Sequence, residues 1–131
     1  MPKPIKATGN CFDNCGRFLL NDQHSEMTLV HCNVVGTGSS VKGIKYSHAF
    51  LITGDGNFAM DLTNDQSNPI MVPLQFFRQL GAVTNELHYS RGEAVAEMIR
   101  TEHFGPWDDS LATDADKESI QPRGKKGKRW S

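Results

Sequence analysis

The chain has 131 residues, a formal net charge of -1 and 22% charged residues. A chain of this length folds as one domain with a substantial core and is too short for two. The balanced charge excludes a protein built as a whole to bind nucleic acid, and no apolar run approaches the ~20 residues of a membrane span. We therefore expect a single domain without membrane association.

The cysteine content indicates a reducing compartment. The chain has three cysteines, an odd number without the spacing of a disulfide framework, and residues 1–6 lack the apolar core of a signal peptide. We therefore expect a cytoplasmic protein. No Cys-x-x-Cys or paired-histidine spacing is present, so we expect neither a metal site nor another cofactor.

The first predicted element is a helix over residues 11–21. Asn10 is a good N-cap, Asp13 stands where an acid favours the positive helix end, and the apolar residues recur at helical spacing. Cys11 is then the first helical residue, where unsatisfied N–H groups favour a thiolate and can donate to an oxyanion. Asn14 follows one turn later and, with Asn10, is a candidate oxyanion donor.

The next segments read as a strand, a connector and a hairpin. Residues 26–35 are rich in β-branched and apolar side chains and predict a strand. Residues 36–43 form a Gly/Ser-rich loop without the Gly-Lys-Ser/Thr ending of a phosphate-binding loop. Residues 45–63 alternate in polarity around a turn, and residues 64–69 predict another loop.

The hairpin brings a histidine and an aspartate together. Tyr46, His48 and Phe50 alternate onto one face of the first strand. Asp55-Gly56 is a strong signal for a two-residue turn, and paired residue numbers then sum to 111, which places Phe50 opposite Asp61. His48 and Asp61 become diagonal neighbours on one face, roughly 7 Å apart. A three-residue loop would turn Asp61 to the other face.

Two helices and a strand are predicted downstream. Residues 72–81 carry Pro near the start and Gly at the end, which predicts a short helix. Residues 86–89 predict a strand. A capping box at residues 90–93 opens a helix that continues to about residue 103. Its apolar stripe, which we expect to pack in the core, comprises Val95, Met98 and Ile99.

The end of the chain reads as a tail. Trp107 follows Gly105-Pro106 and is expected to fold back on the body. Acidic residues and then a basic cluster at 123–129 replace the apolar pattern, which predicts a domain over residues 1–107 and a disordered charged tail over 108–131. Basic residues can bind nucleic-acid phosphates, so any nucleic-acid contact is expected only through this cluster, although a solvated tail is the simpler interpretation.

Cys11, His48 and Asp61 together supply a nucleophile, a base and a group that orients the base. Each has an ordinary structural alternative, because a buried Cys behaves as a small hydrophobe and a strand His or Asp often serves packing or capping. The rings of Tyr46 and Phe50 indicate a substrate groove beside the triad. His31 is a second candidate base.

The order of these segments resembles the papain-like superfamily, in particular its transglutaminase-like and NlpC/P60-like branches. Gly9-Asn10-Cys11 is similar to the Cys motif that opens the core helix, and residues 29–36 are similar to the strand that follows. His48-Ala49-Phe50 resembles a His-Ala-Trp motif, and Met60-Asp61-Leu62-Thr63 resembles an Asp-Pro-Thr motif. The resemblance covers residues 9–63, with Phe in place of Trp and Leu in place of Pro.

The resemblance implies an α+β fold in which a small antiparallel sheet packs against an N-terminal helix bearing Cys11 and a C-terminal helix. It also implies that Cys11 attacks an amide of a peptide or protein, that His48 transfers the proton and that Asp61 orients His48. Hydrolysis and acyl transfer both remain open. The alternatives are an inactive binding module of the same fold, a nucleic-acid-associated protein that uses its basic tail, and a transferase of different chemistry in which His31 and the Gly/Ser-rich loop of residues 36–43 hold a nucleotide.

Overall fold

The computed structural model describes residues 11–21, 26–36, 43–62 and 70–113. Helices and strands alternate irregularly along the chain. Their bounds are α1 (Cys11–Asn21), β1 (Thr28–Val35), β2 (Lys45–Ile52), β3 (Phe58–Asp61), β4 (Ile70–Pro73), α2 (Leu74–Leu80), β5 (Thr84–Tyr89), α3 (Arg91–Thr101) and a 3-10 helix, η1 (Asp109–Leu111).

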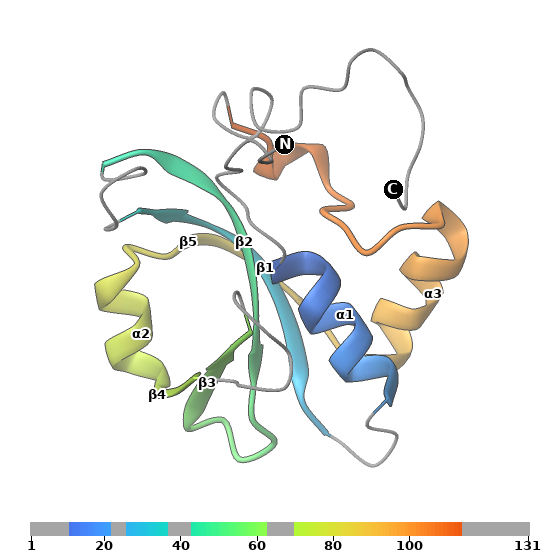
Figure 1. Ribbon diagram of the computed structural model, residues 1–131, viewed down its shortest axis with the longest axis horizontal. Coiled ribbons are helices and arrows are strands. Elements are labelled where there is room, and N and C mark those ends of the chain that lie inside the picture. The colour runs from blue at the N-terminus through green and yellow to red at the C-terminus, as the bar shows by residue number, and fades with distance from the viewer. Residues whose placement is uncertain (1–10, 22–25, 37–42, 63–69, 114–131) are drawn as a thin grey trace, which may run out of the picture.

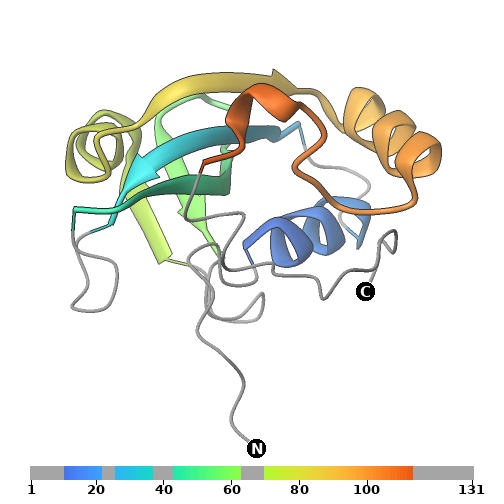
Figure 2. The same cartoon turned by 90° about the horizontal axis from the view of Figure 1, so that it is seen from above.

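The five strands form one antiparallel sheet in the order β4-β3-β2-β1-β5. Helices α1 and α3 lie on one side of the sheet and α2 lies on the other (Figure 1 and Figure 2). This arrangement confirms the predicted α+β class, in which a Cys-bearing helix precedes the strands of the sheet along the chain and a second helix follows them.

Side-chain alternation divides the core into two apolar layers, one on each face of the sheet. On β2, Ala49 and Leu51 belong to the layer under α1 and α3. Phe50 and Ile52 belong to the layer under α2. His48 has the same parity as Phe50, so it points toward α2.

The β2–β3 hairpin has the predicted register but a different turn. Leu51 pairs with Met60 and Ile52 with Ala59, so the paired numbers sum to 111 as predicted. The Gly56 N–H donates to the Thr53 carbonyl at 2.8 Å, which centres the turn on residues 54 and 55. Asp55 lacks the positive φ that the predicted turn requires. The prediction of a two-residue turn was therefore wrong, but a loop longer by two residues keeps the same faces paired.

Strand β4 replaces the start of the predicted helix and includes residues 70 and 71, to which the sequence assigned no element. The predicted loop over residues 64–69 lies outside the described residues. Residues 70–73 pair with β3, and Pro73 is both the last strand residue and the N-cap of α2. Ile70 and Met71 are 52% and 49% exposed. The hairpin partner supplies the pairing that makes this short edge segment a strand, and such long-range pairing leaves no local pattern in the sequence.

Helix α3 has the predicted capping box, with Ser90 accepting from the Glu93 N–H and Glu93 accepting from the Ser90 N–H. Met98 is buried as expected, but Ile99 is 73% exposed, so the prediction that it packs in the core was wrong.

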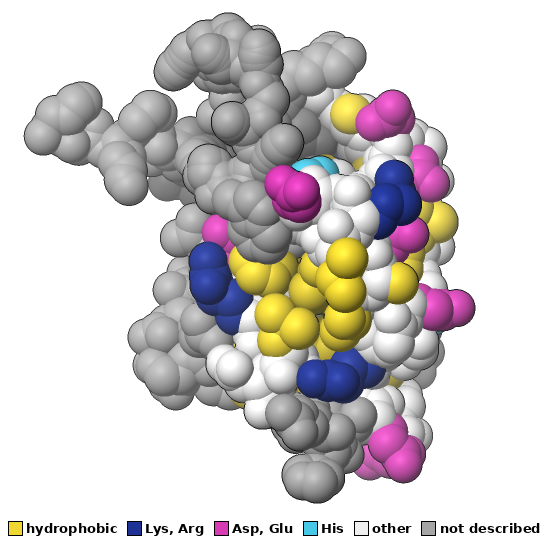
Figure 3. Space-filling view, turned by 90° about the vertical axis from the view of Figure 1, so that its right-hand side faces the viewer, with side chains coloured by type: hydrophobic (Ala, Val, Ile, Leu, Met, Phe, Trp, Pro, Cys, Tyr) yellow, Lys and Arg dark blue, Asp and Glu magenta, His cyan; other side chains and the backbone are white. Residues whose placement is uncertain are grey.

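On the side of the molecule formed by α1 and α3, hydrophobic side chains gather between basic ones (Figure 3).

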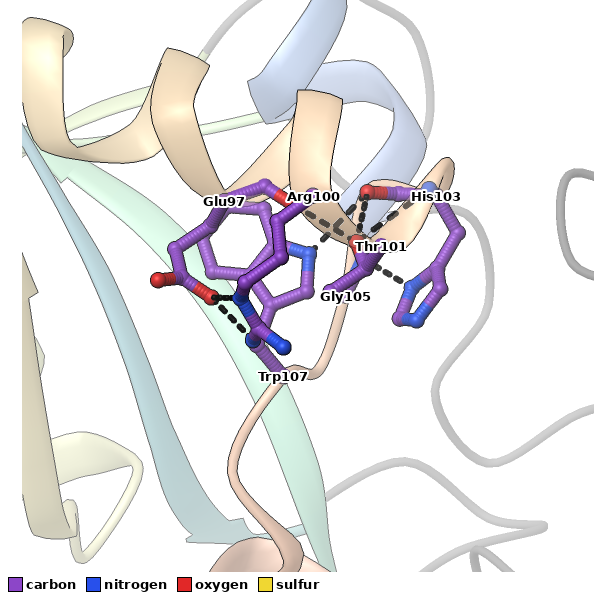
Figure 4. A network of polar contacts seen from close by, with 6 residues as sticks. All are labelled: Glu97, Arg100, Thr101, His103, Gly105 and Trp107. Atoms are coloured by element: carbon purple, nitrogen blue, oxygen red, sulfur yellow. Dashed lines mark hydrogen bonds and ion pairs between the residues drawn. The ribbon is translucent and has the colours of Figure 1, made fainter.

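The segment after α3 is held against the body. The Trp107 indole N–H donates to the His103 carbonyl at 3.0 Å, and the Gly105 N–H donates to His103 Nδ1 at 3.0 Å (Figure 4). The predicted return of Trp107 is confirmed, since its ring packs against the layer under α1.

The ordered body extends beyond the predicted boundary at residue 107. Leu111, in η1, is fully buried, and its carbonyl accepts a hydrogen bond of 2.9 Å from the Asn33 side chain. The expectation of disorder from residue 108 was therefore wrong for residues 108–113, because one buried leucine and one side-chain hydrogen bond fix this segment. The basic cluster at 123–129 lies outside the described residues. No helix in the described ranges is long and apolar enough to span a membrane.

Candidate active site

Helix α1 begins at Cys11, as the sequence predicts, and the Cys11 side chain has no exposed surface. The thiol therefore sits at the positive end of an 11-residue helix, where N–H groups without helical partners favour an anion. Asn10, the predicted N-cap and oxyanion donor, lies outside the described residues.

His48 and Asp61 meet on the α2 side of the sheet. His48 Nε2 lies 3.7 Å from Asp61 Oδ1, and the two side chains are 6% and 21% exposed. Their shared face follows from the hairpin register, because residues opposite or diagonal to one another point to the same side. The structure thus brings together the two residues that the sequence placed as diagonal neighbours.

Cys11 is the second partner of His48. Burial alone lowers the pKa of His48, but the charge of Cys11, the close side-chain contacts with Asp61 and Cys11, and the charge of Asp61 together raise it to about 10. A buried imidazole takes up a proton at neutral pH only when anionic groups surround it. The three predicted triad residues therefore form one interacting cluster.

One ring nitrogen of His48 is available within the cluster. Nε2 faces Asp61, whereas Nδ1 is buried and makes no hydrogen bond to any residue that the structure describes. A buried polar atom without a partner costs free energy and calls for an explanation. An imidazole held by a carboxylate through one nitrogen can use the other to transfer a proton.

Aromatic rings enclose His48 on the α2 side. The ring of Tyr46 stands edge-on to the imidazole at 6.2 Å, and the ring of Phe77 lies at 6.3 Å with an interplanar angle of 30°. Burial first, and then the charges of Cys11 and Asp61, raise the pKa of Tyr46. Phe50 has no exposed surface, so it supports the site from the core and does not line a groove.

Asn14 connects the helix to the aspartate strand. Its side-chain amide donates to the Leu62 carbonyl at 2.6 Å. Leu62 directly follows Asp61, so this hydrogen bond fixes the start of α1 relative to the end of β3. Asn14 is therefore placed to hold Cys11 and Asp61 in register.

The other two cysteines lie in the core as buried thiols. Burial, as the largest cause, raises the pKa of Cys15 and of Cys32 well above the ordinary value. The Cys32 thiol donates to the His48 carbonyl at 3.6 Å. Both side chains are thus neutral packing groups at physiological pH. The described part of the chain contains no cluster of His, Cys, Asp and Glu that could hold a metal ion.

His31, the second candidate base, occupies a different environment. It is fully buried on β1, and its ring contacts the rings of Phe12, Tyr89 and Trp107 at 4.6–5.1 Å. Neither ring nitrogen has a hydrogen-bond partner among the residues that the structure describes. Burial, assisted by the charge of His103, lowers the pKa of His31 to about 3. An imidazole that stays neutral in an aromatic box does not match the base role.

Sequence reasoning missed Phe77 as a neighbour of His48. The helix prediction over residues 72–81 included it, but the contact depends on how α2 docks on the sheet. The spacing of Leu74 and Phe77 by three residues was the available signal, because such a pair shares one helix face. Both side chains pack against the layer under α2.

Comparisons of this chain with protein-family models, with curated proteins and with solved structures find no significant match.

Proposed function

We propose that the protein is a cysteine-dependent hydrolase or acyl transferase that acts on an amide bond of a peptide or protein. The observation that carries the proposal is the contact of the buried His48 with both Cys11 and Asp61. The resemblance of residues 9–63 to the papain-like superfamily supports the same assignment. The buried thiols are those expected of a reducing compartment, so a cytoplasmic location is part of the proposal.

In the proposed reaction, His48 holds the proton of the Cys11 thiol as an imidazolium, and the Cys11 thiolate attacks the amide carbonyl carbon. The carbon–nitrogen bond of the resulting tetrahedral intermediate then breaks, and the imidazolium returns the proton to the departing amine. The product of this half-reaction is a thioester on Cys11. Attack by water releases a carboxylic acid, whereas attack by an amine completes acyl transfer.

Two further groups assist these steps. Asp61 holds the imidazole in one orientation and stabilises the imidazolium, as the third member of a triad does. The backbone N–H groups at the start of α1 have no partners within the helix, so they can donate to the oxyanion of the intermediate. Asn14 keeps this helix end beside the aspartate strand through its bond to Leu62.

The test is the rate at which iodoacetamide alkylates each cysteine of the folded protein as a function of pH, measured by mass spectrometry. Wild type is compared with His48→Gln and with a control, His88→Gln, which removes a half-exposed histidine paired with Glu86. We expect Cys11 to react at pH 6–7 at least about tenfold faster than Cys15 and Cys32, and to lose this advantage only in His48→Gln. An equal Cys11 rate in all three proteins, rising only near an ordinary thiol pKa of ~8.5, contradicts the proposal.

The complete burial of Cys11 favours a second candidate function, a binding module that keeps the fold without chemistry. A nucleophile must meet its substrate, so this candidate predicts that even a small alkylating reagent reaches Cys11 only when the protein unfolds. The dependence of the alkylation rate on urea separates the two. If alkylation requires unfolding, the rate follows the small unfolded fraction and rises already in sub-denaturing urea, which supports the binding module. If Cys11 reacts in the folded protein, the rate stays unchanged until the unfolding transition, which supports the enzyme.

A further inference from the structure

Helix α2 contacts the sheet through a small number of side chains. None of its seven residues is fully buried, and Phe76 and Leu80 are 55% and 51% exposed. Leu74 and Phe77 are the residues of α2 that pack against the apolar layer on this face. Phe77 is therefore the aromatic side chain by which α2 reaches the core.

The position of the Phe77 ring is fixed by Phe50. Their ring centroids are 4.6 Å apart, which is a close aromatic contact. Phe50 stands two residues after His48 on the same face of β2, so a ring held against Phe50 also lies over the imidazole. The angle of 30° between the rings of Phe77 and His48 shows that the two planes are close to parallel.

We propose that Phe77 is a positioning residue, which holds the imidazole of His48 toward Asp61 and favours its charged form. The proposal rests on the proposed function, because it assigns Phe77 a role in the chemistry of the same cluster. Phe77 touches neither Cys11 nor a substrate in this assignment and acts only through His48.

Three physical effects support the role. The Phe77 ring on one side and the Tyr46 edge on another restrict rotation of the imidazole, so Nε2 stays directed at Asp61. The apolar ring also keeps water from the ion pair, and charges interact more strongly where water is excluded. A ring face about 6 Å from a cation attracts it through the ring quadrupole, which favours the imidazolium over the neutral ring.

The test is a titration of the histidine ring signals by NMR in four proteins: wild type, Phe77→Leu, Phe77→Tyr and Phe76→Leu. Leu keeps an apolar contact with Phe50 but removes the ring face, whereas Tyr restores it. Phe76→Leu is the matched control, since it makes the same change at the exposed neighbouring position. We expect the His48 midpoint to fall by about 0.5 to 1 pH unit in Phe77→Leu only.

An unchanged His48 midpoint in Phe77→Leu overturns the inference, and so does an equal shift in Phe76→Leu. Phe77→Met serves the same comparison if Phe77→Leu does not give a folded protein. The readout is independent of Cys11 chemistry, so the two proposals fail separately. A Cys11 alkylation rate that is the same in wild type and in His48→Gln contradicts the proposed function. A His48 midpoint that depends on Phe77 would still stand in that case as a structural finding.

Discussion

Two buried histidines of one sheet have opposite properties. His48 points toward α2, contacts Cys11 and Asp61, and has a pKa raised to about 10. His31 points toward α1, lies in a box of aromatic rings, and has a pKa lowered to about 3. The surroundings of His48 favour a proton on its ring, and those of His31 favour the neutral ring.

The difference shows that burial does not identify a functional histidine. Burial lowers the pKa of both side chains, since it disfavours the charged form of an imidazole. Only the charged partners of His48 reverse that effect. A histidine is therefore a candidate catalytic base when its surroundings compensate for burial, and a core residue when they do not.

The largest expected effect is acid destabilisation through His31. Because its folded pKa is lowered, the unfolded chain binds the proton first, and stability present above pH 6.5 is lost as pH falls toward 3. Between pH 6.5 and pH 4 this amounts to about 3 kcal/mol. Urea unfolding of wild type and His31→Leu at pH 6.5 and at pH 4 measures this loss in the free energy of unfolding. An equal loss in the two proteins would assign the acid sensitivity to other groups.

A second expected effect is local to the aromatic box. Gly105 has a φ of 114°, and a Cβ built there would lie 2.5 Å from Cε1 of His31. We expect Gly105→Ala to lower the free energy of unfolding by about 2 kcal/mol, because it adds backbone strain and a clash with a fully buried ring. Thermal unfolding checks the loss. The alkylation profile of Cys11 should not change, and a change would show that the two histidine environments are coupled.

Removing the carboxylate beside His48 should weaken the binding of the proton by His48 by about 1.4 kcal/mol. In Asp61→Asn the His48 imidazolium loses its carboxylate partner, so we expect the His48 midpoint to fall by about one pH unit. Histidine NMR titration measures the shift, and the His31 signal in the same spectra is the internal control. A His48 midpoint that stays at the wild-type value would remove Asp61 from the cluster.

The smallest expected effect lies outside both regions. Ser90→Ala removes the cap of α3, in which the Ser90 side chain accepts from the Glu93 N–H at 3.1 Å. We expect a loss of about 1 kcal/mol in the free energy of unfolding, measured by urea denaturation. Neither histidine midpoint should move, so a shift in either one would mean that these titrations report general stability.

The sequence predicted the parts of the site that depend on local pattern. The start of α1 at Cys11 follows from capping and apolar spacing, and the shared face of His48 and Asp61 follows from strand alternation and loop length. Even the wrong turn left this face correct, because the true loop takes one more residue from each strand and the paired residue numbers still sum to 111.

The remaining features depend on long-range contacts. Strand β4 exists because β3 pairs with it, and Leu111 is ordered because Asn33 reaches it across 78 positions of the chain. The contact between Phe77 and His48 depends on the docking of α2, which no local pattern specifies. The sequence also gave no means to separate His31 from His48, since the rings and charges around each histidine come from other elements.

The most direct test of the account is the His48 titration in wild type and in Cys11→Ala. We predict a midpoint of about 10 in wild type, and a clearly lower midpoint in Cys11→Ala, which removes the side chain that contributes most to raising the His48 pKa. His31 should stay uncharged to about pH 3 in both proteins. The same His48 midpoint with and without the Cys11 thiol would contradict the central claim that the two residues form a nucleophile–base pair.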